Sequence, residues 1–549
     1  MARFLYVGDK NQNTSLVDFE HGHQPKQWAA LSYCWGTDHS RKLTTSSLRD
    51  LQLGIALNEL DATIRDAISI TRALGIDYLW VDALCILQDG LKQDWTLQAS
   101  QMREIYENST ITLVAADSIS VVQGFLSLRN EHDVPLTWRL DDPSSESPCG
   151  GHIQQVYVSK SRCPNDDKLD GPWTNRGWTF QESLLPNRLL FYSSSQMVWK
   201  CCQEIRYERG NRHNPMLEVA KEFSDEGGRN FWGFDLFTKF KLMHWYLDLL
   251  GNSIARSQEK YRLWYELVEG YSSRQLKYHS DRLVAISGLA ARYGSALGND
   301  QYLMGLWRAD IIRGLLWRVQ EEKLLDHWTR SKVFSKEFHA PSWTWVGVPL
   351  GSVIRNDHAG VVDFNPLATV RDAGIEHLGS PNPFEVAHNG IINLHGPTFR
   401  FFKLYHEDWQ TPATALSAFE RHLSRVIEDE YLQRAKEFSH EGNYAAVLML
   451  QHLVAIDHRI DVLILEAVPV APNAKPTTFK RVGVFKLVYF ADCVKASPAL
   501  VASHKKTVNS LQNRLDPGRG PRRVRFIDCR KVFEELEVNM WHCETLAIV

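Results

Sequence analysis

The chain has 549 residues, of which 44% are hydrophobic and 23% are charged, and its length indicates about two to four domains. This composition excludes a wholly disordered or collagen-like chain. Lys and Arg total 62 against 65 for Asp and Glu. The net charge of -3 excludes a general nucleic-acid coat, because phosphate binding needs a basic surface.

The sequence pattern gives no targeting or membrane signal. The first residues, MARFLYVGDKNQ, include no apolar h-region, so no secretory signal is expected. There is no run of about 18 apolar residues that would predict a membrane helix. The nine cysteines are scattered and form no CxxC pair, which favours reduced thiols in the cytosol or nucleus. The expected location is cytoplasmic. We therefore expect no membrane partner.

The first third of the chain alternates short apolar runs with helical periodicity. The apolar runs predict strands at Ala29–Cys34, Tyr78–Leu87 and Ile111–Ala116, and the periodic segments predict helices at Leu57–Leu74 and Gln93–Tyr106. Asn58 is the expected N-cap of the first helix, and Gly75 is its expected stop. This alternation predicts an α/β fold built on a parallel sheet.

The rest of the chain is less regular. Residues 141–171 are polar and rich in turn residues, and they predict a loop excursion. Further strands are expected at Arg188–Tyr192, Gln196–Cys201, Ser342–Val348, Ile391–Leu394, Asp461–Ala467 and Arg481–Phe490, and helical segments at Glu218–Tyr293, Tyr302–Val319 and Ala415–Phe438. The basic stretch Ser503–Arg525 is interpreted as a solvated loop rather than a nucleic-acid patch.

Three segments carry the most specific pattern. They are ALSYCWG at Ala30–Gly36, LWVDALCILQ at Leu79–Gln88 and RGWTFQE at Arg176–Glu182. In this order and at these distances they resemble the heterokaryon incompatibility (HET) domain of fungal proteins. The resemblance implies a role in non-self recognition and in programmed cell death after incompatible hyphal fusion. The expected organisation is an N-terminal extension over 1–23, a HET domain over 24–205, a mainly helical region over 206–330 and a mixed α/β region over 331–549.

The same segments show a weaker similarity to TIR domains. LSY at Leu31–Tyr33 looks like the first-strand box of those domains, and Asp82 resembles the aspartate that ends their second strand. Trp178 and Glu182 have the W-x-x-x-E spacing of NAD-cleaving TIR enzymes, which places both residues on one face of a helix. The similarity implies a flavodoxin-like α/β domain whose ligand binds at the carboxyl ends of parallel strands.

The TIR similarity implies hydrolysis of NAD or a related nucleotide, with NAD as substrate and no bound cofactor. Breaking the nicotinamide–ribose bond develops oxocarbenium character on the sugar, which a carboxylate can stabilise. Glu182 is the candidate for this carboxylate, with Asp82 beside it. Candidate substrate-binding residues, including tryptophans for stacking and an arginine for phosphate, are Tyr33, Trp35, Gly36, Arg176, Trp178 and Gln181.

Cys85 permits a different chemistry. A cysteine at a strand end is a candidate nucleophile where a nearby base lowers its pKa, but the sequence offers no recognisable histidine partner. A buried structural cysteine is the alternative interpretation. Cys149, His152 and Cys163 lie in one predicted loop, and Cys201 lies further downstream. A structural zinc site normally needs four closely spaced ligands, so no metal is expected.

Two other functions remain open at this stage. The scaffold could be a non-catalytic signalling module whose motifs only hold the fold, or a biosynthetic enzyme that acts on a secondary-metabolite small molecule. The sequence contains no P-loop, ankyrin or WD-repeat pattern, so the sensor modules fused to some HET relatives are missing. The expected partners are a small nucleotide or metabolite and further copies of the same chain, and nucleic acid is not expected.

Overall fold

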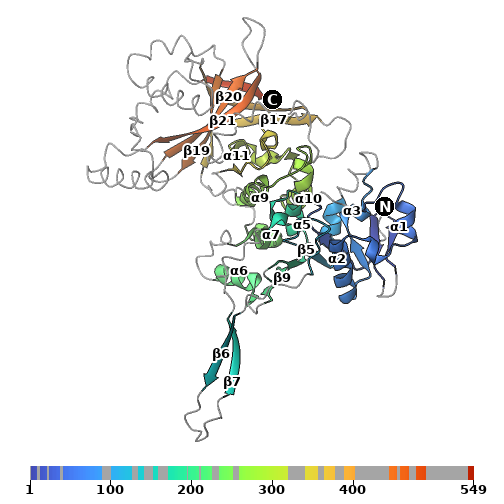
Figure 1. Cartoon of the computed structure of the whole chain (residues 1–549). Coiled ribbons are helices and arrows are strands. Elements are labelled where there is room, and N and C mark those ends of the chain that lie inside the picture. Colours follow the sequence, from blue (N-terminus) through green and yellow to red (C-terminus); the bar gives the residue numbers. More distant parts are fainter. Residues whose placement is uncertain are drawn as a thin grey trace, which may run out of the picture. The chain divides into compact units, whose positions relative to one another are not determined.

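The computed structural model describes residues 2–8, 13–20, 24–36, 41–89, 101–126, 134–140, 152–158, 171–194, 196–208, 212–224, 234–250, 259–298, 300–319, 340–356, 364–376, 389–401, 444–453, 458–468, 478–489 and 542–549. These residues form two compact units, Met1–Lys241 and Leu242–Val549. Figure 1 colours the chain from the first unit, in blue and teal, to the second, in green through red. The described part contains no helix long and apolar enough to cross a membrane.

The first unit is built on one sheet with nine described strands. Its order is β11-β10-β9-β8-β5-β3-β4-β1-β2. The strands are β1 (Ala2–Tyr6), β2 (Ser15–Phe19), β3 (Ala29–Ser32), β4 (Tyr78–Trp80), β5 (Ile111–Ala115), β8 (Arg188–Tyr192), β9 (Met197–Cys201), β10 (Ile205–Tyr207) and β11 (Arg212–His213). The four central strands are parallel, and the outer strands on both sides pair antiparallel. The α/β fold is confirmed, and the sheet is mixed instead of purely parallel.

The parallel strands run in the spatial order β4-β3-β5-β8. In chain order this is 2-1-3-4, the arrangement with which a flavodoxin-like sheet begins. The direction of winding reverses between β3 and β5, and open α/β sheets bind ligands outside the carboxyl ends of strands at such a reversal. The residues that follow β3 and β5 therefore occupy the position where a ligand is expected.

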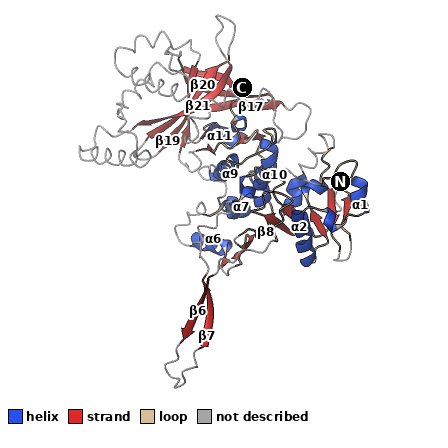
Figure 2. Cartoon of the chain, in the orientation of Figure 1, coloured by secondary structure: helices blue, strands red, loops and turns tan. Residues whose placement is uncertain are grey.

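Helices and turns connect the parallel strands (Figure 2). Between β3 and β4 lie α1 (Leu48–Leu53) and α2 (Ala62–Ala73). The expected helix begins at Ala62 and not near Asn58, because residues 57–59 form a separate 3-10 turn and Asp61 occupies the N-cap. Gly75 follows the helix with a φ of +69°, which confirms it as the stop. Residues 101–108, from the second expected helix, are helical, while residues 90–100 lie outside the described part.

The segment Tyr78–Leu87 is only partly a strand. β4 ends at Trp80, and a helical turn, α3 (Asp82–Cys85), follows at once. Ala83, Leu84 and Cys85 are all fully buried. An apolar run that is buried on every side looks the same in a strand and in a helical turn, so periodicity could not separate the two.

The expected loop excursion contains a strand. β6 (Val134–Leu140) and β7 (His152–Val158) pair as an antiparallel hairpin, and β7 falls inside the predicted loop. Residues 141–151 and 159–170 lie outside the described part. The chain then enters the 3-10 helix η3 (Pro172–Asn175) and the helix α5 (Thr179–Leu184) before reaching β8. The strands expected at Arg188–Tyr192 and Gln196–Cys201 are confirmed as β8 and β9.

The described residues between 215 and 296 are mainly helical, as predicted. Their helices include α6 (Pro215–Ser224), α7 (Leu236–Leu250), α9 (Arg262–Ser272) and α10 (Asp281–Ala296). The predicted helix over Tyr302–Val319 is wrong. The segment folds into the hairpin β12 (Tyr302–Leu303) and β13 (Leu306–Trp307), the turns η6 (Arg308–Asp310) and α11 (Ile311–Gly314), and the strand β14 (Arg318–Val319). Met304 and Gly305 at the hairpin tip have φ values of 45° and 95°, which no right-handed helix accommodates.

The strand predicted over Ser342–Val348 is also wrong. A 3-10 turn, η8 (Trp345–Gly347), occupies this segment. The Thr344 side chain accepts a hydrogen bond from the Val346 amide at 3.2 Å and caps this turn. The following two-residue strand β15 (Ile354–Arg355) pairs with β14.

The C-terminal part of the second unit is a sheet with seven described strands. These are β16 (Phe364–Pro366), β17 (Thr369–Glu376), β18 (Asn389–Phe401), β19 (Tyr444–Leu453), β20 (His458–Ala467), β21 (Thr478–Tyr489) and β22 (His542–Ile548). The pairings of β19, β20, β21, β22 and β18 close into a ring. The three strands expected at Ile391–Leu394, Asp461–Ala467 and Arg481–Phe490 fall on β18, β20 and β21, while Ala415–Phe438 and Ser503–Arg525 lie outside the described residues.

Candidate functional site

The three sequence motifs meet at the carboxyl ends of the central strands. Ser32 is the last residue of β3, Asp82 follows β4 by two positions, and Glu182 lies in α5. The Ser32 hydroxyl donates a hydrogen bond to Oε2 of Glu182 across 150 residues of sequence. The fold therefore assembles one polar site from segments that are far apart in the chain.

Asp82 is held by groups from two motifs. Trp35 Nε1 donates to its Oδ2 at 2.7 Å, and the Ala83 amide donates to its Oδ1 at 2.7 Å. Burial raises the pKa of Asp82, although the hydrogen bond from Trp35 and the charge of Arg176 oppose the rise. Both carboxylate oxygens thus have donors, and the side chain is fixed in one orientation.

Arg176 connects the third motif to the first. Its Nη1 donates to the carbonyl oxygen of Tyr33 at 2.6 Å. Burial lowers the pKa of Arg176, but the neighbouring acidic groups, Glu182 foremost, outweigh it and the pKa is raised. Burial and the neighbouring Asp82 carboxylate raise the pKa of Tyr33 well above its usual value. The site therefore combines two carboxyl groups with one permanent cation and a neutral phenol.

Glu182 is a buried acid with a raised pKa. Its side chain is only 6% exposed, and burial raises its pKa to about 7. The hydrogen bond from Ser32 and the charge of Arg176 lower the pKa, while the charge of Asp82 raises it. A carboxyl group with this pKa exists in both protonation states near neutral pH, which is common at functional sites.

Cys85 has the surroundings of a structural cysteine. It is fully buried, and the Val81 amide donates to its sulfur at 3.4 Å. Burial raises the pKa of its thiol to about 12. A thiol with this pKa is protonated at neutral pH and is a weak nucleophile. The geometry therefore gives no support to nucleophilic catalysis by Cys85.

The remaining candidates occupy different environments. Gln181 is 1% exposed, and its Oε1 has no hydrogen-bond partner among the described residues. Trp178 is half-buried at the start of α5. Gly36 is exposed and has a φ of +71°, and a Cβ atom there would lie 2.6 Å from the Cβ of Ser120. Gly36 is thus required for the turn that carries Trp35, and its backbone is accessible to a ligand.

Three residues at the site were not predicted from the sequence. Ser32 lies within the first motif, and Trp173 Nε1 donates to its hydroxyl oxygen at 2.6 Å. Tyr106 donates to the Leu31 carbonyl at 3.1 Å. Its hydroxyl also lowers the pKa of Glu182. The available signal was a single serine in an otherwise apolar buried strand, because a buried hydroxyl needs partners.

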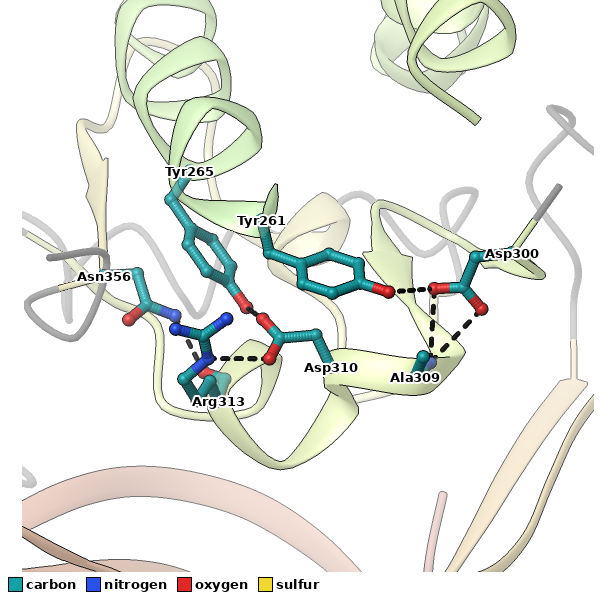
Figure 3. Close-up of polar contacts among 7 residues, drawn as sticks. All are labelled: Tyr261, Tyr265, Asp300, Ala309, Asp310, Arg313 and Asn356. Carbon is teal, nitrogen blue, oxygen red and sulfur yellow. Dashed lines mark hydrogen bonds and ion pairs between the residues drawn. The ribbon is translucent and has the colours of Figure 1, made fainter. Parts of the chain in front are cut away.

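A second buried polar cluster lies in the second unit (Figure 3). Tyr265 donates to Asp310, and Arg313 Nε donates to Asp310 Oδ1 at 2.6 Å. Asn356 donates to the Arg313 carbonyl at 2.7 Å. An adjoining cavity, lined in part by Tyr265 and Asn356, has room for about one water molecule. This cluster joins α9, η6 and α11 and has the character of a structural network.

Among the described residues, no group of three His, Cys, Asp or Glu side chains could hold a metal ion. Cys149 and Cys163 lie outside the described part. Of the residues considered as zinc ligands, His152 lies in β7 and Cys201 in β9.

The first unit is thus a mixed α/β domain with a buried carboxylate site at the reversal point of its sheet. Residues 28–182 match the model of the family described as Heterokaryon incompatibility protein (HET), so the chain carries a HET domain there. The matched range contains all three motifs and every candidate residue of the site. No match was found among curated proteins or among solved structures.

Proposed function

We propose that the HET domain hydrolyses the N-glycosidic bond of NAD or a related nucleotide. The observation that carries the proposal is the convergence of Glu182, Asp82 and Arg176 at the carboxyl edge of the parallel strands. This edge is where open α/β sheets bind ligands. Carboxylates and a fixed cation suit a substrate that has both a cationic ring and phosphates.

In this reaction the bond between the ribose carbon and the nicotinamide nitrogen breaks. The bonding electron pair leaves with the nicotinamide, whose ring becomes neutral, and positive charge develops on the ribose. The ionised Glu182 carboxylate stabilises this oxocarbenium character. A water molecule then bonds to the ribose carbon and releases a proton to the solvent, which yields a free hydroxyl.

The other site residues have supporting roles in the proposal. Arg176 pairs with a phosphate oxygen, and Trp178 or Trp35 stacks on a flat ring. The hydrogen bond from Trp35 to Asp82 fixes the plane of that indole ring. Tyr33 and Asp82 flank the ribose side of the site.

The family description connects this domain with heterokaryon incompatibility. We propose that NAD loss contributes to cell death in that setting, and that self-association of the chain gates the activity. Loss of NAD stops energy metabolism, so an enzyme of this kind needs such a gate. A rate of nicotinamide release per protein molecule that rises with protein concentration would support this gating by self-association.

A non-catalytic signalling module is the second candidate. The observation that favours it is that Ser32, Trp35 and Arg176 all bond within the domain. Together with the burial of Glu182, these contacts could serve only to hold the fold. In that case a partner would bind elsewhere on the surface.

The test is nicotinamide release from NAD by the purified full-length chain, beside Glu182→Gln. We expect the variant to lose at least about 100-fold in rate, the range known for removal of one electrostatic stabiliser. Glu204→Gln is the matched control, because Glu204 is also not fully exposed, lies outside the site and has a side chain whose ion pair with Arg212 is long, at 3.8 Å.

Absence of release from the wild type, even at high protein concentration, would contradict the hydrolase proposal. It would favour the signalling module if folded Glu182→Gln still kills cells that express it.

A further inference from the structure

Two residues outside the sequence-predicted candidates, Ser32 and Trp173, are linked to the Glu182 carboxylate by hydrogen bonds. Trp173 Nε1 donates to Ser32 Oγ at 2.6 Å, and the Ser32 hydroxyl donates to Glu182. The exposed fractions of Trp173, Ser32 and Glu182 are 2%, 1% and 6%. The three side chains form a continuous buried chain of hydrogen bonds.

The chemistry of the three groups fixes the direction of this chain. An indole N–H can only donate, so Ser32 Oγ must accept from Trp173. The single hydroxyl proton of Ser32 is then directed to Glu182. If Glu182 were protonated and donated to Ser32, the hydroxyl proton would lose this acceptor. The chain therefore favours the ionised carboxylate, which is the form that stabilises positive charge.

Trp173 is itself held in place from several sides. Thr179 Oγ1 donates to its carbonyl oxygen at 2.6 Å. Its ring packs edge-on against Phe191 of β8, with ring centroids 5.7 Å apart. A Cβ atom on Gly171, the N-cap of η3, would lie 2.3 Å from the Ala116 carbonyl oxygen. The start of η3 therefore packs closely against the end of β5. The indole donor is therefore preorganised.

We propose that Ser32 and Trp173 are positioning residues that orient the Glu182 carboxylate and keep it ionised for catalysis. The role in catalysis rests on the hydrolase proposal. The effect of Ser32 and Trp173 on the orientation and ionisation of Glu182 does not depend on that proposal. The hydrogen bond from Ser32 lowers the pKa of Glu182 against the opposing effect of burial. Without that bond, Glu182 would remain protonated to higher pH.

The experiment compares Ser32→Ala, Ser32→Thr and Trp173→Phe with the wild type as purified full-length chains. The rate of nicotinamide release at saturating NAD is measured from pH 5 to 9. In the wild type we expect it to rise to a plateau with a midpoint near the Glu182 pKa of about 7. In Ser32→Ala the midpoint should move up by about 1 to 2 pH units, as for loss of a hydrogen bond to a charged group.

The remaining variants separate positioning from packing. Ser32→Thr keeps the hydroxyl and should retain the wild-type midpoint. Trp173→Phe leaves Ser32 without its fixed donor and should give a smaller upward shift. Ser109→Ala is the matched control, because Ser109 is also buried but donates to the Tyr106 carbonyl oxygen at 2.9 Å. Its pH midpoint should be unchanged, and KM should change less than about twofold in all variants.

A second readout needs no activity. The melting temperature depends on pH in part because Glu182 ionises. The contribution of Glu182 is the part of this pH dependence that is lost in Glu182→Gln. Stability falls as pH rises through the folded-state pKa, and in Ser32→Ala this fall should extend to higher pH.

The two proposals can fail separately. If the wild type releases no nicotinamide but Ser32→Ala shifts the stability profile, the hydrolase proposal is wrong and the hold on Glu182 stands. An unshifted profile in both Ser32→Ala and Trp173→Phe, or an equal shift in Ser109→Ala, would overturn the positioning role. If Ser32→Ala does not fold, Trp173→Phe decides the outcome.

Discussion

At the residue scale, Glu182 makes the stability of the protein depend on pH. Its pKa is about 7 in the folded chain against a usual 4.5, chiefly because it is buried. The folded state thus binds more protons than the unfolded state in this interval, and stability falls as pH rises. We expect wild type to lose up to about 3 kcal/mol relative to Glu182→Gln between pH 4.5 and 7. Urea unfolding of both proteins across this range measures the difference, and parallel curves would contradict the account.

Gly36 occupies a position that only glycine fits without strain. Its φ of +71° is strained for other residues, and an added Cβ would collide with Ser120. Gly36→Ala should therefore lose about 2–3 kcal/mol of stability in urea unfolding. Gly75→Ala is the control, because Gly75 has a φ of +69° but no atom within 4 Å of the added Cβ, and it should lose only about 1 kcal/mol. Equal losses would show that Ser120 yields easily.

Cys85 should be inert to thiol reagents in the folded chain. It is fully buried, and burial raises its pKa to about 12. Alkylation by iodoacetamide at pH 7.5, mapped by mass spectrometry, should reach the half-buried Cys201 and Cys202 and leave Cys85 unmodified. Rapid modification of Cys85 would restore the nucleophile hypothesis.

Part of the candidate site could be predicted from the sequence. Motif order was sufficient to bring Glu182, Asp82 and Arg176 into one candidate site, and the structure brings all three together. Ser32 was missed because its motif was interpreted as an apolar strand. The partner Trp173 precedes the third motif, and spacing alone gives no sign that its indole nitrogen reaches β3.

At the element scale, the buried network of Figure 3 holds α9, η6 and α11 together. Asp310 is 8% exposed and accepts from both Tyr265 and Arg313. Asp310→Ala would leave the buried Arg313 guanidinium without this carboxylate, and we expect a loss of about 3–5 kcal/mol. Asp300→Ala should cost about 1 kcal/mol, because Asp300 is half-buried and binds Tyr261 and the Ala309 amide. Unfolding of each full-length variant, followed by tryptophan fluorescence, tests whether Asp310→Ala loses more stability than Asp300→Ala.

Elements were predictable where apolar residues formed a helical stripe or a continuous run. The apolar stripe of α2 and the runs that became β5, β20 and β21 indicated their structure directly. The prediction over Tyr302–Val319 failed because Met304 and Gly305 adopt left-handed backbone conformations. Helical periodicity of apolar residues does not report such a turn when both sides of it are buried.

At the scale of the whole molecule, the N-terminal motifs predicted a domain but not its complete sheet. β1 and β2 extend that sheet from residues that precede the matched range of 28–182. They pair antiparallel and carry no motif, so their place beside β4 could not be inferred from spacing. In the second unit, the closed ring of strands pairs β18 with β22 across about 150 positions, which no local pattern encodes.

Chromatographic detection of nicotinamide and the complementary ribose product from NAD, using concentrated full-length protein, shows directly whether the HET domain is a hydrolase. We expect the two products to form in equal amounts. Release should fall at least about 100-fold in Glu182→Gln, while Glu204→Gln should behave as wild type. Failure of the wild type to release nicotinamide, or full activity in a folded Glu182→Gln, would contradict the hydrolase proposal.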